Sequence, residues 1–170
     1  KYPLRDYKSL RLHEIETDEK YDLVNEISEI ILEENQIKTV KIENEKIKGY
    51  IQIIKTSKED NKVTGTKKDS PLEGVKFEIY DEKGNLIQKL TTDTNGMAKS
   101  KDLEKGFYRV KEVETNEWYL LDKNVYETEI KNNHQVVTLN LENIPKNPDE
   151  EINKKGPDEA FAGDEIQYNI

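Results

Sequence analysis

Three polar residues, Lys55, Glu112 and Asn143, interrupt stretches in which every second residue is apolar. The neighbours expected on the same strand faces are Ile51 and Ile53 for Lys55, Tyr108 and Val110 for Glu112, and Leu139 and Leu141 for Asn143. Burying a lone charged side chain costs several kcal/mol unless it is paired or neutralised. The residues therefore escape to solvent at strand ends, form a buried Lys–Glu ion pair, or take part in a reaction.

Together, the three side chains have the chemistry to form an amide bond within the chain. A dry interior favours the neutral form of an amine, which is a nucleophile. A carboxylic acid in the same surroundings stays protonated, so that it can polarise an amide carbonyl and carry protons. The Lys55 amine would attack the carboxamide carbon of Asn143 with Glu112 as the acid, and ammonia would leave. Because this reaction occurs once per molecule, we expect no enzyme activity.

The elements that would position these residues are short β-strands. Apolar residues recur with a period of two between residues 49 and 146, which is typical of half-buried strands. Turns are predicted at residues 81–85 and 93–96, where Asn95-Gly96 favours positive φ. We expect an all-β chain with an Ig-like or prealbumin-like β-sandwich of about seven strands. The clearest strands are expected at residues 51–55, 75–79, 86–91, 106–112, 125–130 and 137–143.

The composition excludes several classes of function. The chain has 170 residues, a formal net charge of -9 and 37% charged residues, against about 25% in a typical domain. The acidic balance argues against nucleic-acid binding, and no stretch is long and apolar enough to span a membrane. With no cysteine, and His13 and His134 as the only histidines, we expect no metal site and no cofactor. Residues 93–96 are predicted as a turn rather than a calcium loop.

The chain contains an internal repeat of about a hundred residues. Residues 13–21 match residues 111–119, and residues 39–44 match residues 138–143 in the same order. The organisation expected from this match is the second half of a preceding copy in residues 1–48, a complete copy in residues 49–146, a polar linker in residues 147–158 and the first strand of a following repeat in residues 159–170.

The half copy retains part of the chemistry of the complete copy. Glu14 matches Glu112 and Asn44 matches Asn143, but the strand that would carry the lysine is missing, so we expect no cross-link there. We expect residues 1–48 to be poorly packed or wrongly paired. Residues 24–34 would also fit an amphipathic helix, but their repeat equivalent alternates, so we expect a strand.

Five segments in order, residues 49–55, 71–81, 92–96, 103–113 and 142–145, resemble the B-type (Cna B-type) repeat of Gram-positive collagen adhesins and the SpaA-like modules of sortase-assembled pilins. The resemblance implies a prealbumin-like sandwich and, as in many members, an intramolecular Lys–Asn isopeptide bond with a nearby acid. Matched motif by motif, these are Lys55, Asn143 and Glu112. The segment 115–119 departs from the family pattern, and residues 162–170 resemble the start of a different surface-protein repeat.

The resemblance implies a structural stalk or spacer in a cell-wall-attached adhesin or pilin-like protein on the surface of a Gram-positive bacterium. Its partners would be adjacent repeats of the same chain, with a host matrix protein or glycan bound through other domains. The alternative is a module that itself binds carbohydrate or a matrix protein. In that case Trp118 and Tyr119 are the candidates for an exposed aromatic platform.

Overall fold

The computed structural model describes residues 9–24, 29–31 and 37–148, and all regular secondary structure in these ranges is β-strand. The predicted first strand of a following repeat at residues 159–170 lies outside the described residues, as does most of the predicted linker. No helix in the described part of the chain has the length and apolar character needed to cross a membrane. The strands are β1 (Ser9–Leu10), β2 (Ile30–Ile31), β3 (Lys48–Ser57), β4 (Lys76–Asp81), β5 (Leu86–Thr91), β6 (Met97–Lys99), β7 (Leu103–Glu104), β8 (Gly106–Glu114), β9 (Val125–Ile130) and β10 (Gln135–Asn143).

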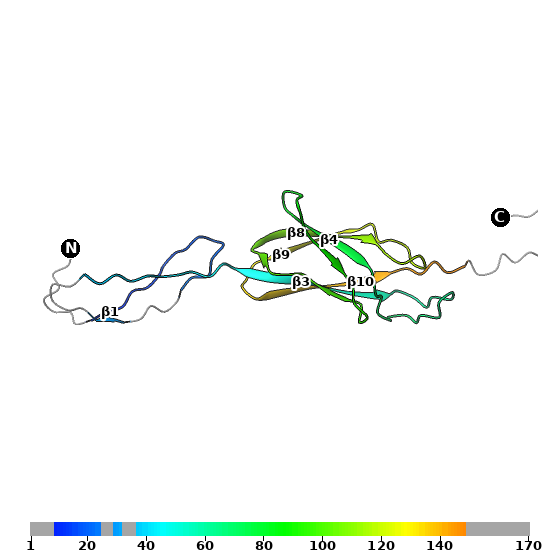
Figure 1. The fold of residues 1–170 in the computed structure, drawn as a ribbon, viewed down its shortest axis with the longest axis horizontal. Helices are drawn as coiled ribbons and strands as arrows, with labels where there is room; N and C mark the ends of the chain where they lie inside the picture. The colour runs from blue at the N-terminus through cyan, green and yellow to red at the C-terminus, as the bar shows by residue number, and fades with distance from the viewer. Residues whose placement is uncertain (1–8, 25–28, 32–36, 149–170) are drawn as a thin grey trace, which may run out of the picture.

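Strands β3 to β10 form a sandwich of two sheets, as Figure 1 shows. One sheet has the order β10-β3-β6, with β7 also paired to β3, and the other has the order β5-β4-β8-β9. All pairs in these sheets are antiparallel except β3 and β10, the first and last strands of the sandwich, which lie side by side in parallel. The predicted all-β sandwich is confirmed.

Alternation along the strands builds the core between the two sheets. In β3 each odd-numbered residue from Ile51 to Ser57 is buried, and each even-numbered one is partly exposed. The same period in β4 and β8 turns one apolar face inward. The apolar side chains with no exposed surface are Ile51, Ile53, Val75, Phe77, Ile79, Val110 and Ile130.

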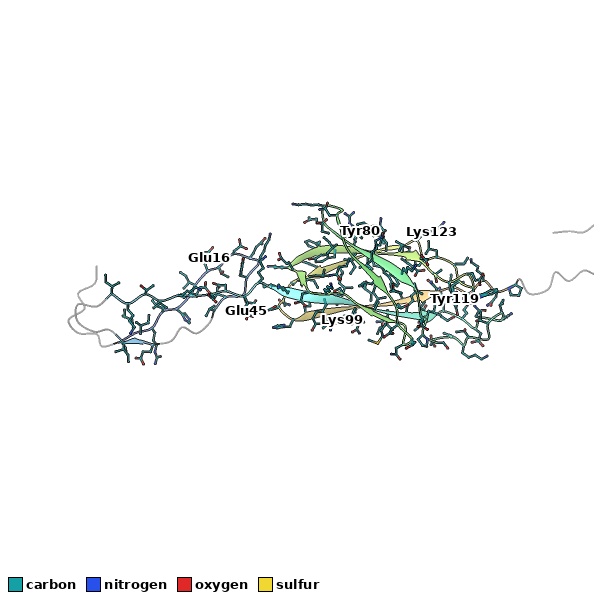
Figure 2. All side chains as sticks on the ribbon, in the orientation of Figure 1. Glu16, Glu45, Tyr80, Lys99, Tyr119 and Lys123 are labelled. Atoms are coloured by element: carbon teal, nitrogen blue, oxygen red, sulfur yellow. The ribbon has the colours of Figure 1, made fainter. Side chains whose placement is uncertain are left out.

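Residues 9–24 and 37–47 extend from one end of the sandwich as an arm that leads into β3 (Figure 1). Charged side chains such as Glu16 and Glu45 project from it (Figure 2). Apolar side chains are open as well, since Ile15 is 89% and Ile37 is 97% exposed. The arm therefore has no core like that of the sandwich in its described residues, as predicted for the half copy. Of the strand expected at residues 24–34, β2 is the described part that forms one, paired with β1.

The predicted turn at residues 93–96 closes against β3. The Asp93 carboxylate accepts hydrogen bonds from the backbone N–H groups of Asn95 and Met97, each at 2.9 Å. Gly96 has a φ of 69°, and its carbonyl accepts a 2.8 Å hydrogen bond from the backbone N–H of Lys55. A Cβ added at Gly96 would lie 2.4 Å from the carbonyl oxygen of Lys55. The turn is therefore held directly on the backbone of the residue predicted to be reactive.

We expect Gly96→Ala to destabilise the sandwich more than Gly74→Ala does. The two glycines have similar φ values, 69° and 77°, but an added Cβ at Gly74 has no neighbour within 4 Å. Gly74→Ala should cost about 1–2 kcal/mol for the left-handed backbone alone, and Gly96→Ala should add the cost of separating the turn from β3. Chemical unfolding followed by circular dichroism measures both, and equal losses would contradict the close packing of this turn.

Candidate functional site

Three strands bring the predicted reactive residues to one place in the core. Lys55 comes from β3 and Asn143 from β10, adjacent strands of one sheet whose parallel register sets Leu141 opposite Lys55 and Asn143 opposite Ser57. Glu112 comes from β8 in the facing sheet. Because all three follow the inward period of their strands, their side chains meet between the sheets.

Glu112 lies between the lysine and the asparagine. The Nζ atom of Lys55 is 2.8 Å from Oε2 of Glu112, and both side chains have no exposed surface. The Nδ2 atom of Asn143, a residue that is 1% exposed, donates a 2.8 Å hydrogen bond to Oε1 of the same carboxylate. Escape to solvent is therefore wrong as an explanation of these three residues, and the buried Lys–Glu ion pair is present.

The surroundings of the ion pair are apolar. The aromatic ring of Phe77 has its centroid 5.8 Å from the Lys55 Nζ atom, within the range of a cation–π contact. Among the described residues, no donor forms a hydrogen bond to Asn143 Oδ1. In the same part of the chain, Lys55 Nζ contacts the Glu112 carboxylate and has no other hydrogen-bond acceptor. Buried polar atoms without partners are rare in folded proteins and call for a specific explanation. The described residues contain four such atoms: Lys55 Nζ and Glu112 Oε2, which face each other in the ion pair, Asn143 Oδ1, and the hydroxyl oxygen of Tyr119. Of these, Asn143 Oδ1 is the carbonyl oxygen of the predicted reaction.

Two further groups complete the site, the side chain of Thr115 and the backbone N–H of Asp122. Neither was predicted from the sequence. Thr115 Oγ1 accepts a 3.0 Å hydrogen bond from Asn143 Nδ2. The backbone N–H of Asp122 donates a 3.3 Å hydrogen bond to Glu112 Oε1. The repeat offered a signal for Thr115, because Thr17 is its match in the segment 13–21. No sequence pattern identified Asp122.

Asp122 and Tyr126 form a second polar pair beside the site. The Tyr126 hydroxyl donates a hydrogen bond to Asp122 Oδ2. Burial raises the pKa of the Asp122 carboxyl, but the hydrogen bonds from Tyr126 and Asn124, together with the charge of Lys55, outweigh it and lower the pKa. Burial and the bond to Asp122 raise the pKa of Tyr126 to about 12. Both groups therefore keep their ordinary charge states near neutral pH.

An open groove runs from this pair to the asparagine. Its lining includes Asp122, Tyr126, Leu141 and Asn143, together with the loop that carries Leu120 and Leu121. Lys55 and Glu112 do not line this groove, and Asn143, which does, is 1% exposed.

Glu14 and Asn44 of the arm are brought together in the same way as their matches in the sandwich. Asn44 Nδ2 donates hydrogen bonds to both carboxylate oxygens of Glu14, at 2.9 and 2.8 Å. The backbone N–H ten residues after the acid, that of Val24, donates a 2.7 Å bond to Glu14, as Asp122 does to Glu112. Within the described part of the chain, no lysine forms an ion pair with Glu14.

The backbone beside the two acid–amide pairs forms the same hydrogen-bonded contacts in the arm and in the sandwich. An antiparallel bridge joins residues 21 and 46 in the arm and residues 119 and 145 in the sandwich. Just before each bridge, a backbone N–H donates a hydrogen bond to the side chain two residues earlier. The bond from Lys20 to Asp18 is 3.0 Å long, and the bond from Trp118 to Asn116 is 3.1 Å long. A matching backbone bond follows each, at 2.8 Å from residue 47 to residue 20 and at 2.9 Å from residue 146 to residue 118.

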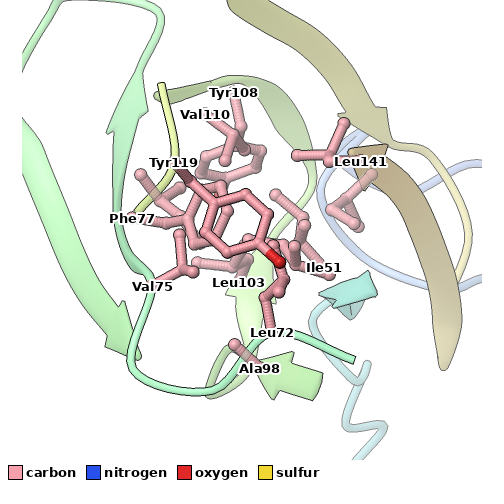
Figure 3. Packing of buried hydrophobic residues seen from close by; sticks show 13 residues of the cluster. Ile51, Leu72, Val75, Phe77, Ala98, Leu103, Tyr108, Val110, Tyr119 and Leu141 are labelled. Atoms are coloured by element: carbon pink, nitrogen blue, oxygen red, sulfur yellow. The ribbon is translucent and has the colours of Figure 1, made fainter. Parts of the chain in front are cut away.

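The predicted aromatic platform is wrong for Tyr119. This residue is 2% exposed and its ring lies within the core cluster, as Figure 3 shows, close to Leu72 and Val75. Its bridge to residue 145 turns the side chain inward. Trp118 is 42% exposed, so one aromatic residue of the pair faces solvent.

Comparisons with known proteins agree on the sandwich. A family model for SpaA, a prealbumin-like fold domain, matches residues 49–145. The trypsin-resistant surface T6 protein of Streptococcus pyogenes serotype M6 is 39% identical over 82 residues, which cover 42% of this chain and 15% of that protein. The structure of the TIE protein of Bacillus anthracis is similar over 79% of this chain and 24% of its own, with 26% identity and a TM-score of 0.65.

A further similar structure is BcpA, the major pilin subunit of Bacillus cereus, with 24% identity and a TM-score of 0.49 over 56% of this chain and 28% of that one. The present chain thus spans less than a third of each of these proteins.

We expect Glu112→Leu to be less stable than the double variant Lys55→Met/Glu112→Leu by about 3–5 kcal/mol, because the single change leaves a buried ammonium without its partner. Neither variant can form the expected amide bond, so urea unfolding reports the ion pair alone. The exposed pair of Lys76 and Glu114, also at 2.8 Å, is the control, and its single variants should change stability by less than about 1 kcal/mol. Equal stability of the single and double buried variants would contradict this account.

Proposed function

Because the chain belongs to the SpaA family of prealbumin-like fold domains, we propose that it is a structural stalk module of a bacterial surface protein or pilus, cross-linked by an amide bond between Lys55 and Asn143. The observation that carries the proposal is the convergence of an amine, a carboxyl and a carboxamide with almost no exposed surface. The surface and pilin proteins to which it is similar support a cell-surface location.

The contacts of Glu112 support the order of the chemical steps. Transfer of one proton across the 2.8 Å contact from Lys55 to Glu112 leaves a neutral amine and a neutral acid, which a dry interior favours over two charges. The Lys55 nitrogen then forms a bond to the carboxamide carbon of Asn143. The bond from that carbon to Nδ2 then breaks. Glu112 gives one proton to the departing nitrogen and takes one from the attacking Lys55 nitrogen, so the acid is unchanged by this step. One amide bond is made, one is broken, and ammonia is the only product released.

The place of this bond in the fold supports a mechanical role. The arm enters β3 at one end of the sandwich and the chain leaves β10 at the other (Figure 1), so a pull on the two ends shears this parallel pair. A bond from Lys55 near the end of β3 to Asn143 at the end of β10 would carry the load directly. The residues between them would then bear no tension. With no cysteine in the chain, this link would also resist reducing conditions.

The matching contacts in the arm support a tandem array. The Glu14–Asn44 pair and the bridge at residues 21 and 46 repeat the arrangement at one end of the sandwich. Contacts also join the two parts, since Lys46 pairs with Glu104 at 2.7 Å and Lys105 Nζ donates a 2.8 Å bond to the Glu19 carbonyl. Adjacent repeats of one chain are therefore the partners that we propose for this module.

The folded chain should be lighter than its sequence mass by one ammonia. Intact-mass spectrometry measures the loss, and fragmentation of a digest should identify a peptide that joins residues 55 and 143. Lys55→Ala, Glu112→Ala and Asn143→Ala should each keep the full mass. Asn44→Ala is the matched control and should lose ammonia as the unaltered chain does. The sequence mass in the folded, unaltered chain would refute the cross-link and leave the fold assignment intact.

Pulled from its two ends, the unaltered chain should show no unfolding step from the residues between 55 and 143. Asn143→Ala should show a step of roughly 300 Å, since about 90 residues extend by at most 3.3–3.6 Å each. Single-molecule force spectroscopy measures this length, with Asn44→Ala as the control that should behave as the unaltered chain. A step of the same length in the unaltered chain would rule out a load-bearing cross-link.

A further inference from the structure

Thr115 is held at the reacting carboxamide by a local irregularity of β8. In the pairing of β4 with β8, Phe77 lies opposite Glu112 and Lys76 lies opposite Glu114, so Val113 is an extra residue with no partner. An extra residue of this kind reverses the inward and outward order of the side chains that follow it. Glu114 is accordingly exposed and paired with Lys76. Thr115, which regular alternation would place on the outer face, hydrogen-bonds to Asn143 at 3.0 Å.

Among the described residues, the carboxamide of Asn143 has hydrogen-bond partners at its nitrogen but none at its oxygen. Its Nδ2 atom has two partners, Glu112 Oε1 at 2.8 Å and Thr115 Oγ1 at 3.0 Å. Its Oδ1 atom is buried and has no donor among the described residues. In this orientation the carbonyl that must accept negative charge during attack is unsupported, and the nitrogen that must leave is held.

A half-turn of the carboxamide exchanges these roles without moving other atoms, because the oxygen and nitrogen of the group have nearly the same size and shape. The oxygen would then lie beside Glu112 Oε1 and Thr115 Oγ1. A hydroxyl can donate as readily as it accepts, so Thr115 can serve either orientation. Glu112 can donate only when protonated. Transfer from Lys55 places the proton on Oε2, so a half-turn of the carboxyl group must then bring the protonated oxygen to the position beside Asn143.

We propose that Thr115 is a catalytic residue of the cross-linking reaction, whose hydroxyl and the protonated Glu112 together donate hydrogen bonds to the Asn143 carbonyl oxygen during attack. This inference rests on the proposed function. Two donors aimed at the oxygen where charge develops stabilise the tetrahedral intermediate of acyl transfer. The carbon–nitrogen bond to Nδ2 then breaks as described above, and Thr115 neither gains nor loses a proton overall.

The test compares the rate of ammonia loss in the full chain and in Thr115→Val and Thr115→Ser. Each chain is isolated in denaturant, its unreacted mass is verified, and folding is started by dilution. Samples quenched in acid give the mass against time, while circular dichroism follows folding separately. Thr115→Val keeps the shape of the side chain and removes the hydroxyl, so the reaction should slow by about 10- to 100-fold. Thr115→Ser should restore a rate close to that of the unaltered chain.

Two controls separate chemistry from folding. In a Lys55→Met background, which cannot react, Thr115→Val should leave the midpoint of urea unfolding nearly unchanged. Thr17→Val, the matched change in the arm, should leave the rate of ammonia loss unchanged. If the unaltered chain reacts and Thr115→Val reacts equally fast, the role of Thr115 is overturned and the proposed function stands. If the unaltered chain folds and loses no ammonia, both are overturned.

Discussion

The contact of Glu112 with both Lys55 and Asn143 is the constraint that the rest of the sandwich must satisfy. A carboxylate and an ammonium without exposed surface are expensive to desolvate, and their mutual attraction compensates only where the geometry is good. An apolar replacement of similar volume would serve stability as well or better. The presence of the pair in a small core, beside a carbonyl oxygen without a donor, is therefore better explained by chemistry than by stability.

The topology of the sandwich brings these groups together. An amine and a carboxamide on neighbouring strands of one sheet can approach each other, while an acid from the facing sheet can reach both. The parallel pairing of β3 with β10 achieves the first condition with strands from the two ends of the domain, separated by all the others. In the proposed stalk the same pairing would make the two strands the direct path for tension, so the proposed chemistry and the proposed mechanical role depend on one strand pairing.

Much of this arrangement could be predicted from the sequence, because the period of two directly reports which face of a strand is buried. β5 and β9 have the predicted bounds, and three interruptions of the pattern identified Lys55, Glu112 and Asn143. The prediction failed where the period is broken or where the chain leaves a strand. The extra residue at Val113 re-aims Thr115, which simple alternation places outside. A bridge to residue 145 buries Tyr119 in a segment that alternation does not describe.

The arm has the acid–amide contact without the burial, whereas the sandwich has both. Its Glu14–Asn44 contact is as short as the Glu112–Asn143 contact, and it forms with no lysine paired to the acid in the described residues. The acid–amide contact therefore does not need the ion pair, and in both parts of the chain an antiparallel bridge closes the backbone beside it. Yet Glu14 and Asn44 are only partly buried, because no facing sheet within the described residues covers them. Water at such a site would stabilise the charged amine and acid, so geometry alone does not make the reactive state. The second sheet supplies the dryness, and this is why the proposed reaction needs a complete sandwich rather than three residues at the right spacing.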